Sequence, residues 1–274
     1  MVADAVTWLC LAAGQGTRLR PITDDKPKAM VSVADRSLLS WLLDTARHTG
    51  IEDRAVVTGY LGDSIDDQVD DDVTIHRNPD YANTDMVRSL WCGSDSLEGT
   101  VVISYSDILY TPTVLKTVLE DPRDVVVAVD EDWQSYWTRR HEEPVEDAES
   151  LAFDGDRITS IGERVESIDA PEAQYIGLMK FSPAGIDRLR ETYAALERAE
   201  AEGVRSTGTK RSFEDIHMTD LLQGMIERDV PVHAARIQGG WVEIDTPRDL
   251  DIARSVCTPT EDGTLNIDRS EFSG

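Results

Sequence analysis

Short apolar runs alternate along the chain with longer segments whose apolar residues recur at helical spacing. Runs of this kind between turn residues predict buried strands, and the spacing of the longer segments predicts helices. The predicted strands are residues 5–13, 54–60, 73–76, 100–107, 124–130, 175–182 and 230–237. The predicted helices are residues 37–50, 84–97, 111–120, 183–202, 214–228 and 246–256. This alternation predicts an α/β fold, with a mostly parallel sheet and helices on both faces.

The alternation breaks between about residue 131 and residue 174. This segment is polar and aromatic, and its later part predicts a hairpin that turns at Asp154–Gly155. We interpret it as an acceptor-binding insertion over the sheet, within a single domain that covers residues 1–257. A basic loop that includes Lys210 separates two of the predicted helices, and the tail 258–274 is expected to be loosely ordered.

The charge balance excludes several classes of partner. The 274 residues include 53 acidic and 27 basic side chains, which give a formal charge of −26. So acidic a surface argues against nucleic acid and against anionic membranes as partners. Lysine is rare, and an acidic, lysine-poor surface suits a cytoplasm at molar salt, where self-repulsion is screened. We therefore predict a halophilic protein, with an ordinary acidic protein as the alternative.

The remaining composition indicates an intracellular protein without disulfides. The three cysteines are widely spaced and form no CxxC pair, so neither a disulfide framework nor a zinc site is expected. Asp4 stands where a signal peptide would carry basic residues, and no apolar run reaches the roughly 18 residues that a membrane span needs. The predicted location is the cytoplasm.

Candidate chemistry begins in the segment LAAGQGTRLRPITDDKPKAM, residues 11–30. Gly14 and Gly16 follow a buried strand, where a glycine turn can present backbone N–H groups to phosphate oxygens. The spacing matches neither a Walker A loop nor the dinucleotide GxGxxG motif, and a simple tight turn is the alternative. Arg18 and Lys28 follow closely, although the chain has few lysines. Cations beside such a turn indicate a phosphate-rich ligand.

This segment resembles the N-terminal signature of the nucleotidyltransferase superfamily, which makes nucleotide sugars and CDP-alcohols. The resemblance continues, in order, through NPDYANTDMVRSLW, SYSDILY, YIGLMKFS, MTDLLQGMI and GGWVEIDTPRDL, and so covers most of the chain. Within the superfamily, the chain looks most like the phosphocholine and 2-aminoethylphosphonate cytidylyltransferases. The resemblance implies a Rossmann-like fold and an enzyme that binds a nucleoside triphosphate.

The resemblance also implies residue roles. Arg18 would hold the β- and γ-phosphates, and Lys28 would contact the α-phosphate as the acceptor attacks. The acceptor is already an anion, so no general base is needed. The nucleotide would be wrapped by the turn residues Leu11, Ala12, Ala13, Gly14, Gln15, Gly16 and Thr17.

Two aspartates follow predicted strands at the edge where α/β sheets bind ligands. Asp107 ends the segment TVVISYSD and Asp245 ends GGWVEID. Mg²⁺ prefers carboxylate and phosphate oxygens, so this pair is the predicted metal site, as it is in the family. The alternatives are that Asp107 caps a turn and that Asp245 stabilises the N-terminus of the following helix.

Candidate residues for the base and the acceptor come from two further segments. Thr84, Asp85 and Ser89 lie where related cytidylyltransferases bind cytosine and ribose, although a helix cap with a surface serine would give the same pattern. Aromatic rings attract quaternary ammonium groups, while arginine would instead pair with a carboxylate or phosphate. The predicted acceptor-binding residues are Trp133, Trp137, Arg139, Tyr175 and Lys180. The alternatives are that one or two of the aromatic rings anchor the insertion to the core, and that Lys180 extends along an apolar strand face to solvent.

These observations predict a Mg²⁺-dependent cytidylyltransferase. It would transfer CMP from CTP to a small phosphorylated or phosphonylated alcohol such as phosphocholine and release pyrophosphate. One alternative is a sugar-1-phosphate nucleotidylyltransferase that uses UTP, dTTP or GTP. Another is a catalytically silent subunit that senses nucleotides. Dimers are common among similar proteins, so a homodimer stands beside a monomer as an expected state.

Overall fold

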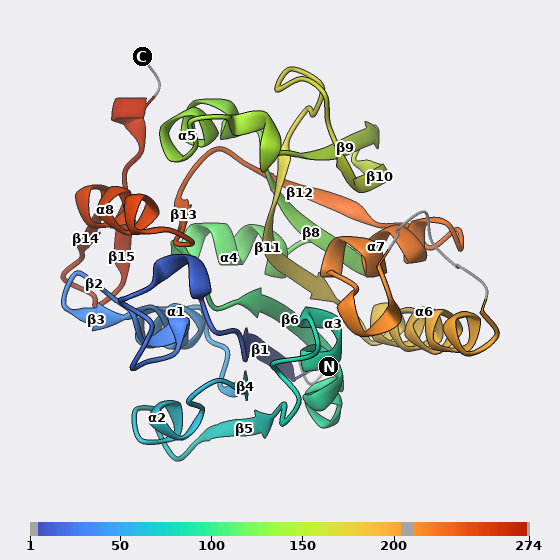
Figure 1. Cartoon of the computed structure of the whole chain (residues 1–274), viewed down its shortest axis with the longest axis horizontal. Helices are drawn as coiled ribbons and strands as arrows, with labels where there is room; N and C mark the ends of the chain where they lie inside the picture. The colour runs from blue at the N-terminus through green and yellow to red at the C-terminus, as the bar shows by residue number, and fades with distance from the viewer. Residues whose placement is uncertain (1–4, 204–210, 273–274) are drawn as a thin grey trace.

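The computed structural model describes residues 5–203 and 211–272, so Lys210 and most of the predicted basic loop lie outside the described residues. A nine-stranded sheet has the order β5-β4-β1-β6-β11-β8-β12-β10-β9 (Figure 1). Its strands are β1 Val6–Ala12, β4 Asp53–Thr58, β5 Val73–Arg77, β6 Thr100–Tyr105, β8 Val125–Asp130, β9 Glu149–Asp154, β10 Arg157–Arg164, β11 Gln174–Phe181 and β12 His233–Ile237. The predicted α/β class is confirmed.

Strand direction explains where the ligand edge lies. Strands β5, β4, β1 and β6 are mutually parallel, and β12 is parallel to β8. Strand β11 runs antiparallel between β6 and β8, so its amino end meets the carboxyl ends of its neighbours. Ligands in such sheets bind at the carboxyl ends of the parallel strands.

Two apolar cores, one on each face, hold the helices to the sheet. Adjacent residues of β1 point to opposite faces, as strand geometry requires, so Trp8 joins one core and Leu9 the other. The Trp8 core includes residues of α1 Leu38–His48, α4 Pro112–Leu119 and α8 Pro247–Val256. The Leu9 core includes residues of α3 Met86–Cys92, α6 Pro183–Ala201 and α7 Met218–Ile226. None of the helices within residues 5–203 and 211–272 is both apolar and long enough to cross a bilayer.

A small strand pair brings the two predicted metal ligands together. Strand β13 Trp241–Glu243 pairs antiparallel with β7 Ile108–Tyr110. The backbone N–H of Ile244 then donates to the carbonyl of Asp107 at 2.8 Å. The remaining short elements are β2 Ser32–Val33, β3 Arg36–Ser37, α2 Asp63–Asp66, α5 Trp133–Arg140, β14 Cys257–Pro259 and β15 Leu265–Ile267.

Two expectations need correction. The hairpin of β9 and β10 turns one residue later than predicted, at Gly155–Asp156, because Arg157 pairs with Asp154. The tail was expected to be loosely ordered, but the chain has regular structure up to Phe272. Strands β14 and β15 form a hairpin, and a 3-10 turn at Ser270–Phe272 follows. This segment ends beside α5 (Figure 1).

Candidate active site

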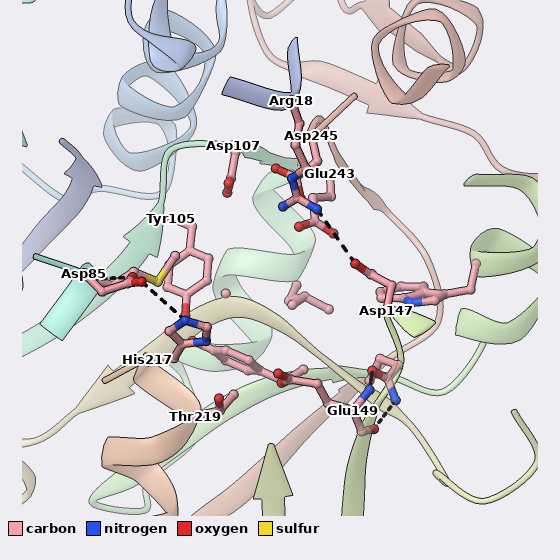
Figure 2. A pocket seen from close by; sticks show the side chains of 16 residues that line it. Arg18, Asp85, Tyr105, Asp107, Asp147, Glu149, His217, Thr219, Glu243 and Asp245 are labelled. Atoms are coloured by element: carbon pink, nitrogen blue, oxygen red, sulfur yellow. Dashed lines mark hydrogen bonds and ion pairs between the residues drawn. The ribbon is translucent and has the colours of Figure 1, made fainter. Parts of the chain in front are cut away.

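A buried lysine links the two predicted metal ligands. Lys28 follows Pro27 at the start of a 3-10 turn, and its Nζ lies 2.6 Å from Asp107 Oδ2 and also pairs with Asp245. Arg18 Nη2 lies 2.6 Å from the other oxygen of Asp245 (Figure 2). Gly16 adopts a positive φ of 62°, and a Cβ there would lie 2.9 Å from Lys28 Cβ. Glycine therefore lets the turn lie against the lysine.

The charges of this group stabilise one another. Burial alone would lower the pKa of Lys28, but Asp107 and Asp245 outweigh it and raise that pKa. Burial alone would raise the pKa of Asp245, but Lys28 and Arg18 lower it to about 2. Both groups are therefore charged at neutral pH, as opposite charges at this separation require.

A third carboxylate, which the sequence did not predict, completes the cluster. Oxygen atoms of Asp107, Glu243 and Asp245 lie within 4.8 Å of one another. Burial raises the pKa of Glu243 and the Arg140 guanidinium opposes that rise, and the oxygen Oδ1 of Asp107 is buried without a hydrogen-bond partner among the described residues. Three carboxylates with an unsatisfied oxygen fit Mg²⁺, which takes oxygen ligands.

Buried side chains hold Glu243 in place. Arg140 Nη1 lies 2.5 Å from its carboxylate, and Arg140 Nε lies 3.0 Å from Asp249. The hydroxyl of Tyr136 accepts a hydrogen bond from the Glu243 backbone N–H at 2.9 Å. The sequence did carry a signal for Glu243: it precedes Asp245 by two residues in an extended segment, and such residues share a face.

A cavity of about 250 Å³ opens beside Lys28 and Asp107. The predicted nucleotide-binding residues that line it are Leu11, Ala13, Gly14, Thr84, Asp85 and Ser89. It is not lined by Ala12, the last residue of β1, or by Gln15, Gly16 and Thr17, which follow. Asn78, which the sequence analysis missed, is buried behind this wall. Its Nδ2 lies 3.0 Å from both the Thr84 and the Ser89 hydroxyls, so it fixes their orientation.

A second cavity of about 290 Å³ meets the first at Asp85, Met86, Tyr105 and Asp107. Figure 2 shows Arg18, Asp245 and Glu243 near one end of it, with Glu149 and Thr219 at the other. The residues that the sequence analysis missed here are Asp147, Glu149, His217 and Thr219. They come from the insertion and from the start of α7, and the segment MTDLLQGMI was part of the family resemblance without a role assigned to any of its residues.

Ionisable side chains line this second cavity. His217 Nε2 lies 3.3 Å from Asp85, and this hydrogen bond is the main reason that the pKa of His217 is raised. Burial raises the pKa of Glu149. Burial alone would raise the pKa of Asp147 too, but His141 lowers it. The cavity therefore offers both carboxylates and a histidine to a bound molecule.

Of the five predicted acceptor residues, Trp137 and Tyr175 line the second cavity. The other three, Trp133, Arg139 and Lys180, lie outside it. Trp133 is 1% exposed and packs edge-on against Trp137, one helical turn away. Arg139 lies over the ring of Phe272 on the surface of α5. The prediction for Lys180 is wrong because β11 is antiparallel: its end lies at the opposite edge, where Lys180 donates to two backbone carbonyls.

The fold and these cavities define a nucleotidyltransferase. Residues 8–167 match the family described as MobA-like NTP transferase domain. The chain is 32% identical to a CTP:phosphoglutamine cytidylyltransferase of Campylobacter jejuni, over 89% of this chain and 97% of that protein. It belongs to this family of nucleotidyltransferases, and it is an enzyme of that class.

Two further comparisons agree. A UTP–glucose-1-phosphate uridylyltransferase of Haloferax volcanii is 27% identical, over 89% of this chain and 93% of that protein. The solved structure of a CTP:phosphocholine cytidylyltransferase from Streptococcus pneumoniae superimposes with a TM-score of 0.68, at 20% identity. It covers 92% of this chain and 99% of that one, which confirms the fold.

Proposed function

We propose that the protein transfers CMP from CTP to a small phosphorylated acceptor and releases pyrophosphate. The observation that carries this proposal is the meeting of two cavities at Asp107, beside Lys28 and Arg18. One cavity suits the nucleotide, and the other suits an acceptor whose phosphate reaches the same point. CTP is favoured as the donor by the near full-length likeness to a cytidylyltransferase.

In the proposed reaction, an acceptor phosphate oxygen attacks the α-phosphorus of CTP. A new P–O bond forms, and the bond from the α-phosphorus to the bridging oxygen breaks with its electron pair on pyrophosphate. Lys28 neutralises charge that develops on the α-phosphate, and Arg18 binds the leaving group. The acceptor is ionised at neutral pH, so no side chain has to remove a proton.

The carboxylate cluster would hold Mg²⁺ beside these cations. Asp107, Glu243 and Asp245 would be its protein ligands, and phosphate oxygens would supply others. The ion contributes positive charge that stabilises the transition state. Lys28 already contacts Asp107 and Asp245, so the same two side chains orient the lysine toward the phosphates.

The acceptor cavity favours a molecule that carries a positively charged nitrogen. Glu149 and Asp147 place carboxylates on its wall, and Trp137, Tyr105 and Tyr175 add aromatic surface. Carboxylates and ring faces both attract ammonium groups. Phosphocholine, phosphoethanolamine and phosphoglutamine each combine such a nitrogen-containing group with a phosphorylated end. The particular acceptor is therefore proposed within this class.

The second candidate function is transfer of a nucleotide to a sugar 1-phosphate. It is favoured by the likeness to the Haloferax uridylyltransferase. A catalytically silent sensor is disfavoured because Lys28, Asp107 and Asp245 lie in mutual contact at the cavity.

Pyrophosphate release separates these candidates. The enzyme is assayed with CTP, UTP, dTTP or GTP against phosphocholine, phosphoethanolamine, phosphoglutamine and glucose 1-phosphate. We expect the highest kcat/KM for CTP with an acceptor that carries a positively charged nitrogen. A preference for UTP with glucose 1-phosphate would support the second candidate. If the protein binds CTP but releases no pyrophosphate with any pair of substrates, the result would support a catalytically silent sensor.

A further inference from the structure

The C-terminal segment, residues 257–272, carries an arginine that lies against residues next to β13. After the β14–β15 hairpin, the Asp268 backbone N–H donates to the carbonyl of Val256 at 3.1 Å, which turns the chain inward. Arg269 follows and is only 7% exposed. A buried guanidinium is costly unless it is paired, so its partner identifies what this segment does.

That partner is Asp130, which is completely buried at the end of β8. Arg269 Nη2 lies 2.6 Å from Asp130 Oδ2, and the same oxygen accepts from Trp241 Nε1 at 2.7 Å. The oxygen Oδ1 accepts from the backbone N–H of Gly239 at 3.1 Å and of Asp132 at 3.0 Å. The carboxylate thus joins the C-terminal segment to the start of β13.

The guanidinium also packs against two aromatic rings that lead to Glu243. Its Cζ lies 4.4 Å from the ring centre of Tyr136 and 5.7 Å from that of Trp241. Tyr136 bonds to the Glu243 backbone through its hydroxyl, at 2.9 Å to the nitrogen and 3.3 Å to the oxygen. Trp241 precedes Glu243 by two residues on β13. Both rings next to Arg269 therefore bear on the position of Glu243.

We propose that Arg269 is a positioning residue for Glu243, the metal ligand on β13. This inference rests on the proposed Mg²⁺-dependent function. Mg²⁺ demands near-ideal octahedral geometry, so small displacements of a ligand weaken binding. Without Arg269, Asp130 loses its charged partner, and Trp241 and Tyr136 lose the group packed against them. Side chains that orient metal ligands typically change affinity by about 10–100-fold when they are replaced.

The test measures Mn²⁺ binding by electron paramagnetic resonance in the absence of substrate. The temperature is kept well below the midpoint of thermal unfolding of each variant. Arg269→Met removes the charge and keeps much of the volume, and we expect its Mn²⁺ dissociation constant to rise about tenfold. Arg269→Lys keeps the charge and loses the flat guanidinium, so we expect a smaller rise. If the methionine variant does not fold, the lysine variant carries the comparison. Asp245→Asn reports whether the ion occupies the carboxylate cluster.

Arg54 is the matched control. Its side chain is fully buried and pairs with Asp72, and its Nη1, like that of Arg269, has no partner among the described residues. It lies in the first residues of β4, remote from the cluster. Arg54→Met should lower stability and leave Mn²⁺ binding unchanged. Equal binding by Arg269→Met and Arg54→Met overturns the inference alone. Absence of Mn²⁺ binding in the unsubstituted protein overturns both the inference and the proposed metal site.

Discussion

Lys28 combines a structural and a chemical role in one side chain. It is 8% exposed, and its positive charge offsets the repulsion between the carboxylates of Asp107 and Asp245. The same ammonium faces the cavity proposed for the nucleotide. Its replacement therefore affects the phosphates during transfer and the resting balance of charge.

Lys28→Met is expected to lower kcat by about 10²–10³-fold, the range for removing a preorganised donor from a developing charge. Steady-state pyrophosphate release measures it. Lys26→Met, two residues earlier and partly exposed, is the control and should keep its kcat. A Lys28→Met enzyme with an undiminished kcat would refute the proposed role.

The residues that immediately precede α3 and α7 form an ion pair with each other. Asp85 precedes α3 and accepts from the Met86 backbone N–H at 2.6 Å, and His217 precedes α7. The two side chains pair at 3.3 Å; Asp85 lines both cavities and His217 lines the second. This contact makes the position of two helices depend on one protonation state.

Stability should follow the charge on His217. The hydrogen bond to Asp85 raises its folded-state pKa, so its stabilisation is complete below the unfolded value of about 6.5. That stabilisation disappears as the pH rises through the folded value. Burial would raise the pKa of Asp85, but His217 lowers it, so the contribution of Asp85 is lost only at acidic pH.

Urea unfolding of the unsubstituted protein and His217→Gln measures this effect. Because both side chains are more than a third exposed, the advantage of the histidine should be about 0.5 kcal/mol greater at pH 5.5 than at pH 8.5. The same difference at both pH values would contradict the prediction.

Asp249 connects the start of α8 to the site. It accepts from the backbone N–H groups of Asp245 at 3.1 Å and Thr246 at 2.9 Å, and it pairs with buried Arg140. Asp249→Ala should lower the free energy of unfolding by about 3–5 kcal/mol, because it leaves a buried arginine short of a partner.

Asp251→Ala provides the comparison for Asp249 in the same helix. Asp251 is exposed and lies 3.7 Å from Arg254, so its loss should cost less than about 1 kcal/mol. Urea unfolding of both variants measures the difference. A similar cost for the two substitutions would show that the buried network contributes little.

At the scale of the whole molecule, the formal charge of −26 should make stability depend on salt. Ions screen repulsion among surface carboxylates, and the Debye length falls from about 10 Å at 0.1 M to about 3 Å at 1 M. We expect the thermal midpoint to rise between 0.1 M and 2 M KCl. Glycerol, which does not screen charge, is the control. A midpoint that does not change with KCl would count against the halophilic prediction.

Most of the sheet could be predicted from the sequence, because buried strands and amphipathic helices leave clear periodic patterns. The direction of β11 could not, since an apolar run reads alike in either direction. That ambiguity led to the wrong placement of Lys180. The C-terminal hairpin was missed because its strands are short, with only Cys257, Leu265 and Ile267 joining the apolar core. Arg269, which follows it, pairs with Asp130, a residue remote in sequence.

The candidate site divides in the same way. Lys28, Asp107 and Asp245 could be found because each follows a predicted strand or turn where ligands bind. Among the acceptor residues of the second cavity, only Trp137 and Tyr175 were predicted; Glu149 and His217 were missed because they are single ionisable residues in the insertion and before a distant helix. Only the folded chain shows that these segments face one cavity.

The reversed strand β11 also brings the two ends of the insertion together. Asp130, where the insertion leaves β8, is the direct register partner of Gln174, where the chain enters β11. The two splice points are therefore neighbours, and a foreign segment with closely spaced ends could be grafted between them. The exchange would replace Trp137, Asp147 and Glu149 and keep the glycine turn and Lys28. The graft would also have to replace β9 and β10 and supply new partners for Glu243 and Asp249, which Tyr136 and Arg140 now provide. The topology thus offers a route to chimaeras with a retained donor half and a new acceptor half.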